Sequence, residues 1–105
     1  MRRKINLSER ADAELTELEK NPRFAGLFKQ VIKTMALLET NTKHSGLHTH
    51  KFNSMTGASG EEVFEAHVQN NTPGAYRIFW HYGPDEIAGK ERIPVVSILA
   101  ITSHP

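Results

Sequence analysis

Hydrophobic positions follow two different periods along the chain. Between residues 7 and 18 an apolar residue recurs every three or four positions among charged ones, which is typical of an amphipathic helix. Ser8 suits the cap before it, and Asn21 with Pro22 ends it, because the residue before a proline disfavours helical geometry. The same pair can start a second helix. The apolar stripe of this second helix comprises Phe24, Leu27, Phe28, Val31, Ile32, Met35 and Leu38.

After a polar loop at residues 40–45 the period becomes two, which predicts β-strands. The last of them is almost continuously apolar and β-branched, as expected of an internal strand. We therefore expect a single α+β domain, residues 1–105, in which an N-terminal helical hairpin packs on one face of a mainly antiparallel four-stranded sheet, in the order ααββββ. The expected strands are residues 48–52, 63–69, 75–82 and 95–101, and the turns between the later strands are residues 70–74 and 83–90.

Alternation along a strand assigns each side chain to one face of the sheet. We assign the row Tyr76, Ile78, Trp80 and Tyr82 to the face under the helices, because it has the largest apolar area. The opposite face then carries a group of polar side chains from all the strands. These are His48 and His50, Glu65 and His67, Arg77 and His81, with His104 after the last strand.

This group contains the side chains that are needed to cleave RNA by attack of its own 2′-hydroxyl on the adjacent phosphate. Imidazole titrates near neutral pH, so one histidine can remove the hydroxyl proton while another protonates the leaving oxygen. The planar guanidinium of Arg77 can bind the phosphate and stabilise its charged transition state. The structural alternative is that Arg77 pairs with Glu65 across the sheet.

Four segments also resemble a known family in their order and sequence. They are residues 45–52 (SGLHTHKF), 62–68 (EVFEAHV), 75–80 (AYRIFW) and 98–104 (ILAITSH). Placed after two helices, they resemble the RelE/ParE toxin superfamily over nearly the whole chain. This resemblance implies a small α+β toxin that is usually encoded beside an antitoxin whose helix or extended tail wraps it. RelE-like members cut messenger RNA in the ribosomal A site, whereas ParE-like members inhibit DNA gyrase without nuclease chemistry.

The resemblance also suggests roles for individual residues. Arg77 matches the strand position of a phosphate-binding arginine in nuclease members, and His104 matches a catalytic histidine near the C-terminus. The segment with His50 and Lys51 corresponds to one that supplies a general base or basic contacts. We therefore expect the catalytic residues to be Arg77, His50 and His104, and the RNA-binding residues to be Lys51, His48 and His81.

The charge distribution keeps a second class of function open. Residues 1–43 hold nine Lys and Arg against six Asp and Glu, whereas residues 44–105 hold four against six. Ribosome-cutting members are strongly basic, because docking on RNA requires many phosphate contacts. The alternative is therefore a non-catalytic protein on the same scaffold, either a gyrase inhibitor or an inactive, domesticated toxin.

Composition limits the remaining possibilities. The chain has no cysteine, which excludes a disulfide, a thiolate zinc site and a cysteine nucleophile.

His48 and His50 with His67 or His81 could form a three-histidine metal site, but we expect no metal or other cofactor, because no motif supports one. Residues 57–60 lack the Walker spacing and are expected to be a flexible turn. No apolar run approaches the roughly 20 residues of a membrane span, so we expect a cytoplasmic protein. The resemblance to the RelE/ParE superfamily implies that its partners are an antitoxin and messenger RNA or the ribosome.

Overall fold

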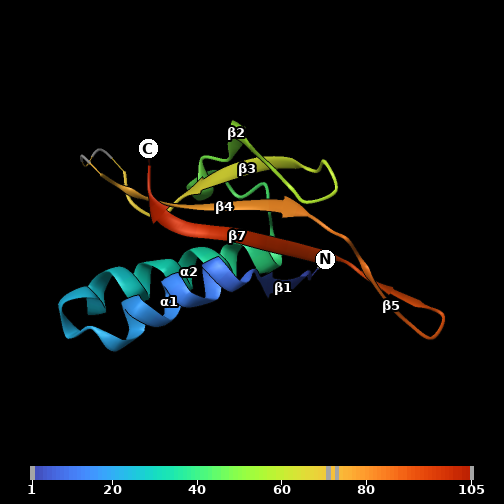
Figure 1. Ribbon diagram of the computed structural model, residues 1–105, viewed down its shortest axis with the longest axis horizontal. Helices are drawn as coiled ribbons and strands as arrows, with labels where there is room; N and C mark the ends of the chain where they lie inside the picture. The colour runs from blue at the N-terminus through green and yellow to red at the C-terminus, as the bar shows by residue number, and fades with distance from the viewer. Residues whose placement is uncertain (1, 71, 73, 105) are drawn as a thin grey trace.

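Two helices and a five-stranded sheet form the two layers of the domain (Figure 1). The computed structural model describes residues 2–70, 72 and 74–104. Helices α1 (Glu9–Lys20) and α2 (Ala25–Thr40) lie side by side against one face of the sheet. The strands, in their order across the sheet, are β1 (Lys4–Leu7), β7 (Val95–Ser103), β4 (Tyr76–Tyr82), β3 (Glu62–His67) and β2 (His50–Thr56).

The predicted helices are confirmed, together with the signals that delimit them. The Ser8 side chain caps α1 by accepting a hydrogen bond from the Ala11 amide at 3.0 Å. Asn21 ends α1, and its side chain then accepts from the Arg23 amide to start a short 3-10 turn, η1 (Pro22–Phe24), that leads into α2. The turn between the two helices is therefore encoded locally, by the Asn21 cap and by Pro22 at the first position of η1.

Replacing Ser8 with alanine is expected to lower the free energy of unfolding by about 1 kcal/mol, the usual cost of an N-cap. The Ser8 hydroxyl also donates to the Leu99 carbonyl oxygen at 2.8 Å, so this cap joins α1 to β7 as well. Urea denaturation measures the change, and the exposed Ser54 provides the control as Ser54→Ala. Equal stabilities of the two variants would contradict the prediction.

The main hydrophobic core lies between the helices and the sheet. Ile78 and Trp80 of β4 are fully buried there beside Val31 and Leu38 of α2, and Tyr76 and Tyr82 pack against the same cluster. The predicted assignment of this row to the helix side is confirmed. Met35 also packs on the core.

The predicted four-stranded sheet is wrong in its number of strands. β1 precedes the helices and pairs in parallel with β7, from Lys4 opposite Val95 to Leu7 opposite Ile98. All other pairings within this sheet are antiparallel. The chain therefore begins with a strand instead of following the order ααββββ, and β7 is internal, as expected.

The segment that was expected to be a turn at residues 83–90 forms part of a separate hairpin. Its strands are β5 (Glu86–Ala88) and β6 (Glu91–Ile93), and the hairpin extends away from one end of the sheet (Figure 1). The Glu86 carboxylate anchors it by accepting hydrogen bonds from Lys4 and Asn6 of β1. These bonds and the positive charge of Lys4 hold the pKa of Glu86 below its usual value.

The face of the sheet opposite the helices is partly covered by β2. The pairing of β2 with β3 is irregular between Lys51 and Thr56, and Phe52 and Met55 of β2 pack on Phe79 of β4. Phe79 is consequently buried although it points away from the helices. The turn predicted at residues 70–74 includes Asn71 and Pro73, which lie outside the described residues.

No helix in the described part of the chain has both the length and the apolar character needed to cross a membrane.

Candidate functional site

The buried carboxylate of Glu65 is the centre of a polar cluster on the face opposite the helices. Glu65 lies in the middle of β3, and its side chain is only 2% exposed. Its Oε1 is 2.6 Å from Nε2 of His50, the residue directly opposite on β2. Its Oε2 is 3.2 Å from Nδ1 of His104, which follows β7. A single carboxylate therefore holds two histidines that are far apart along the chain, His50 near its middle and His104 near its C-terminus.

Arg77 lies beside this carboxylate and is held firmly in place. Its side chain is 11% exposed, and its Nε is 3.8 Å from Glu65 Oε1. Its Nη1 donates hydrogen bonds to the carbonyl oxygens of Gln69, at 2.6 Å, and Tyr76, at 3.0 Å. Nε has no hydrogen-bond partner among the described residues. Arg77 thus pairs with Glu65 across the sheet, as the structural alternative predicted, and the two opposite charges lie next to each other.

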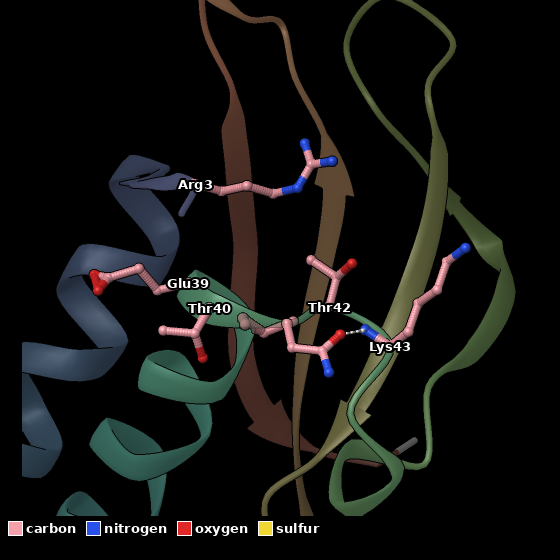
Figure 2. Close-up of a pocket in the computed structure, with 7 residues that line it drawn as sticks. Arg3, Glu39, Thr40, Thr42 and Lys43 are labelled. Atoms are coloured by element: carbon pink, nitrogen blue, oxygen red, sulfur yellow. Dashed lines mark hydrogen bonds between the residues drawn. The ribbon is translucent and has the colours of Figure 1, made fainter. Parts of the chain in front are cut away.

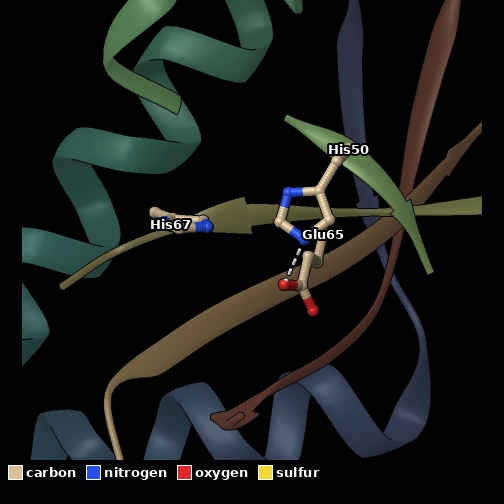
Figure 3. A group of neighbouring side chains, drawn as sticks. All are labelled: His50, Glu65 and His67. Carbon is tan, nitrogen blue, oxygen red and sulfur yellow. Dashed lines mark ion pairs between the residues drawn. The ribbon is translucent and has the colours of Figure 1, made fainter. Parts of the chain in front are cut away.

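His67 completes the cluster, and Figure 3 shows it together with His50 and Glu65. It lies two residues after Glu65, on the same face, and its ring centroid is 5.5 Å from that of His50. Its Nδ1 is 2.6 Å from Asn70 Oδ1, whereas its Nε2 is buried without a partner among the described residues. Burial lowers the pKa of His67; the bond to Asn70 opposes this shift, and the charge of Arg77 adds to it.

A cavity of about 440 Å³ opens beside the cluster. Phe52 forms one wall, with its ring 4.7 Å from that of Phe79 and 6.4 Å from that of His104. Thr102 and Ser103, which precede His104, line another wall, and Arg10 of α1 contributes a positive charge. The two exposed imidazoles, 53% for His50 and 45% for His104, thus lie near a hollow with aromatic walls.

None of the three predicted RNA-binding residues, Lys51, His48 and His81, contacts the Glu65 carboxylate, whose partners are His50, Arg77 and His104. Lys51 faces the other side of β2 and forms an ion pair at 2.6 Å with Glu62, whose carboxylate raises the pKa of Lys51. His81 is buried, with its Nδ1 3.0 Å from the Tyr82 carbonyl oxygen, and it lines a separate cavity of about 310 Å³.

His48 is not part of a strand, which corrects the prediction that it shares a strand face with His50. It follows the 3-10 turn η2 (Ser45–Leu47), and its φ of 46° places it in the left-handed region, so alternation does not apply to it. Its ring nevertheless approaches His67, with 5.2 Å between the centroids. Its carbonyl oxygen lies 3.0 Å from Nδ1 of His50.

The sequence pattern placed Glu65 in the polar group and as a pairing partner of Arg77, but it assigned this residue no role in the site. The available signal was its position: a carboxylate in the middle of an alternating strand, on the face that carries the histidines. The register then brings it opposite His50.

Two other features lie away from this cluster. Residues 57–60 form a turn in which the Glu61 carboxylate accepts a hydrogen bond from the Ser59 amide. Figure 2 shows a smaller cavity of about 170 Å³ at the end of α2, lined by Arg3, Glu39 and Lys43 among others. There Arg3 lies over the Tyr82 ring at 4.8 Å.

Comparisons with known proteins support the fold. No family model matches the chain. No curated protein matches it either. Among solved structures, the YoeB dimer from Staphylococcus aureus is similar over 100% of both chains, with a TM-score of 0.58 and 10% sequence identity. The chain therefore shares the fold of this YoeB structure, and the α+β architecture agrees with the one that the sequence resemblance implied.

Proposed function

We propose that the chain is the toxin of a toxin–antitoxin pair and cleaves messenger RNA without a metal ion. The observation that supports this proposal is the arrangement around Glu65, where one buried carboxylate holds two exposed imidazoles beside a guanidinium. The fold shared with YoeB supports the toxin class. We further propose that it acts in the cytoplasm and is held inactive there by its antitoxin.

The hydrogen bonds suggest a role for each histidine. His104 uses Nδ1 to bond Glu65, and this leaves Nε2 as the atom that exchanges protons, as in catalytic dyads where a carboxylate orients a histidine. His50 faces acceptors with both nitrogens, the His48 carbonyl oxygen and Glu65, so its cationic form satisfies both contacts. His104 is thus the general base and His50 the general acid, which differs from the sequence prediction of His50 as the base.

The reaction follows from these roles. His104 Nε2 takes the proton of a 2′-hydroxyl while that oxygen attacks the adjacent phosphorus. The bond from phosphorus to the 5′-oxygen breaks, and the half-exposed His50 ring turns its Nε2–H from Glu65 toward that oxygen and gives it the proton, which leaves a 2′,3′-cyclic phosphate and a 5′-hydroxyl. The positive charge of Arg77 stabilises the pentavalent transition state.

The neighbouring cavity suggests how RNA is held. A base can stack on an aromatic ring with a free face, which contributes about 1–3 kcal/mol per base. Phe52 is half-buried and lines the cavity, with its ring tilted against Phe79 and edge-on to the His104 ring. We therefore propose that one base next to the cleaved phosphate stacks there, with Arg10 near the backbone.

Expression of the chain in a bacterium without an antitoxin tests this function. The wild type is expected to arrest growth and to generate new 5′-hydroxyl RNA ends, and both effects are expected to be lost in His50→Ala and in His104→Ala. Both side chains are about half exposed, so these variants are expected to fold. His44→Ala, which changes an exposed histidine outside the cluster, is the matched control.

Two outcomes would contradict the nuclease. The first is growth arrest that persists in both histidine variants. The second is arrest with intact RNA and signs of DNA damage, which would favour the gyrase-inhibitor alternative. The small number of cations in the half that forms the polar cluster favours that alternative, since residues 44–105 hold four Lys and Arg, of which Lys51 pairs with Glu62 and Arg77 is buried.

A further inference from the structure

Three potential metal ligands converge on the face of the sheet opposite the helices. The nearest ligand atoms of His50, Glu65 and His67 all lie within 4.8 Å of one another. Glu65 and His67 share one face of β3, and His50 lies directly opposite Glu65 on β2, so two paired strands fix their positions. We propose that these three side chains form a binding site for a divalent transition-metal cation, with Zn²⁺ as the ion that suits them best.

The hydrogen bonds of the two histidines favour a cation between them. Metal-binding histidines usually donate one ring N–H to an oxygen, and this leaves the other nitrogen as the ligand. Here Nδ1 of His67 bonds the Asn70 side-chain oxygen at 2.6 Å, and Nδ1 of His50 bonds the His48 carbonyl oxygen at 3.0 Å. In neutral histidines these bonds place a lone pair on each Nε2, facing the Glu65 side.

A cation at this position would bind two groups of atoms in the cluster, the unpaired Nε2 of His67 and the close pair of His50 Nε2 and Glu65 Oε1. His67 Nε2 is buried and has no hydrogen-bond partner within the described residues, although a buried polar atom of this kind is costly to leave unpaired. His50 Nε2 lies 2.6 Å from Glu65 Oε1. With Nδ1 donating to His48, a proton lies between these two atoms at this hydrogen-bond distance. A zinc ion would replace that proton and engage His67 as well, once the two atoms move apart to about 3.3 Å, the separation of tetrahedral ligands at about 2.0–2.1 Å from the metal.

The donor set selects the class of ion. Two imidazole nitrogens and one carboxylate oxygen are typical of zinc sites with an open position for water, and imidazole disfavours Mg²⁺ and Ca²⁺. The His48 ring, 5.2 Å from His67, lies close enough to become a further ligand after a small shift. His104 bonds the other oxygen of Glu65 and is therefore an outer partner of the carboxylate.

The site has a consequence for the proposed nuclease, and this consequence rests on the proposed function. A bound ion occupies the His50 atom that otherwise carries the proton for the leaving oxygen. It also neutralises the carboxylate that orients His104. Zinc is therefore expected to inhibit RNA cleavage, whereas Mg²⁺ is not.

Zinc binding to the purified full-length chain, after chelator treatment and dialysis, tests the site without RNA. Isothermal titration with ZnCl₂ is expected to give one ion per chain, and CoCl₂ is expected to give the visible absorption of a four- or five-coordinate site. His67→Ala and Glu65→Gln are each expected to weaken zinc binding at least tenfold. Asn70→Ala, which removes only the outer partner, is expected to weaken it about 10- to 100-fold. His44→Ala is the control and is expected to bind like the wild type.

The outcomes separate this inference from the proposed function. A wild-type chain that binds no zinc at 100 μM, or a loss of binding that is equal in His67→Ala and in the control, would overturn the metal site. Circular dichroism of each variant shows whether a loss reflects unfolding, and His67→Gln, which keeps most of the side-chain volume, repeats the test. Zinc binding without any RNA cleavage would leave the metal site intact and refute the nuclease.

Discussion

Glu65→Gln is expected to lower the rate of the proposed RNA cleavage about 10²- to 10⁴-fold, the range seen when a residue that orients a catalytic histidine is neutralised. The carboxylate accepts from His50 with Oε1 and from His104 with Oε2. The amide offers one acceptor oxygen, and its NH₂ group then faces an imidazole N–H. It also removes the negative charge beside the buried guanidinium of Arg77. A single substitution therefore disturbs all three proposed catalytic residues.

Because Glu65 does not touch the substrate in this mechanism, the variant is expected to reduce kcat while KM changes little. Single-turnover cleavage of an RNA oligonucleotide measures both effects. Glu62→Gln is the matched control, since Glu62 lies on the same strand but is exposed and paired with Lys51. Thermal unfolding of both variants separates an active-site effect from destabilisation, which is expected because Arg77 loses its buried partner. Full activity of folded Glu65→Gln would remove Glu65 from the mechanism.

The parts of the fold that could be predicted from the sequence are those with local causes. Helix α1 begins at the Ser8 cap and the turn that leads into α2 begins at the Asn21 cap, and the internal strands β4 and β7 carry strong period-two or continuous apolar patterns. β1 was missed because its four residues carry only a short pattern, and its partner Val95 is more than 90 positions away along the chain. The β5–β6 hairpin was missed for a similar reason, since glycine and proline around it are equally typical of a loop.

The candidate site could be predicted only in part. Alternation correctly placed Arg77, His50 and Glu65 on the same face. It could not give position along the strand: His81, four residues after Arg77, lies roughly 13 Å further along β4 and lines another cavity. It also could not give the burial of Glu65, because that depends on how β2 curves over the sheet and on where His104 lies after β7.

Trp80→Ala is expected to lower the free energy of unfolding by about 3–5 kcal/mol, the largest effect on stability that we predict. Trp80 is fully buried between the sheet and the helices, where its ring stacks on Phe64 at 5.1 Å and meets Tyr82 at 4.8 Å. The substitution leaves a cavity at the centre of the main core. Against a total stability of about 5–15 kcal/mol for a domain, this loss removes a large part of the stability, and at the lower end of that range it leaves much of the chain unfolded.

Trp80→Phe distinguishes lost packing from lost polar contacts. The indole N–H is buried and has no hydrogen-bond partner in the described part of the chain, so its removal costs little, and most of the aromatic area remains. We expect Trp80→Phe to retain more than half of the stability that Trp80→Ala loses, as measured by urea denaturation. Ile87→Ala, on the exposed β5–β6 hairpin, is expected to change stability by less than about 0.5 kcal/mol. A Trp80→Ala variant as stable as Ile87→Ala would show that the helices do not pack on this face of the sheet.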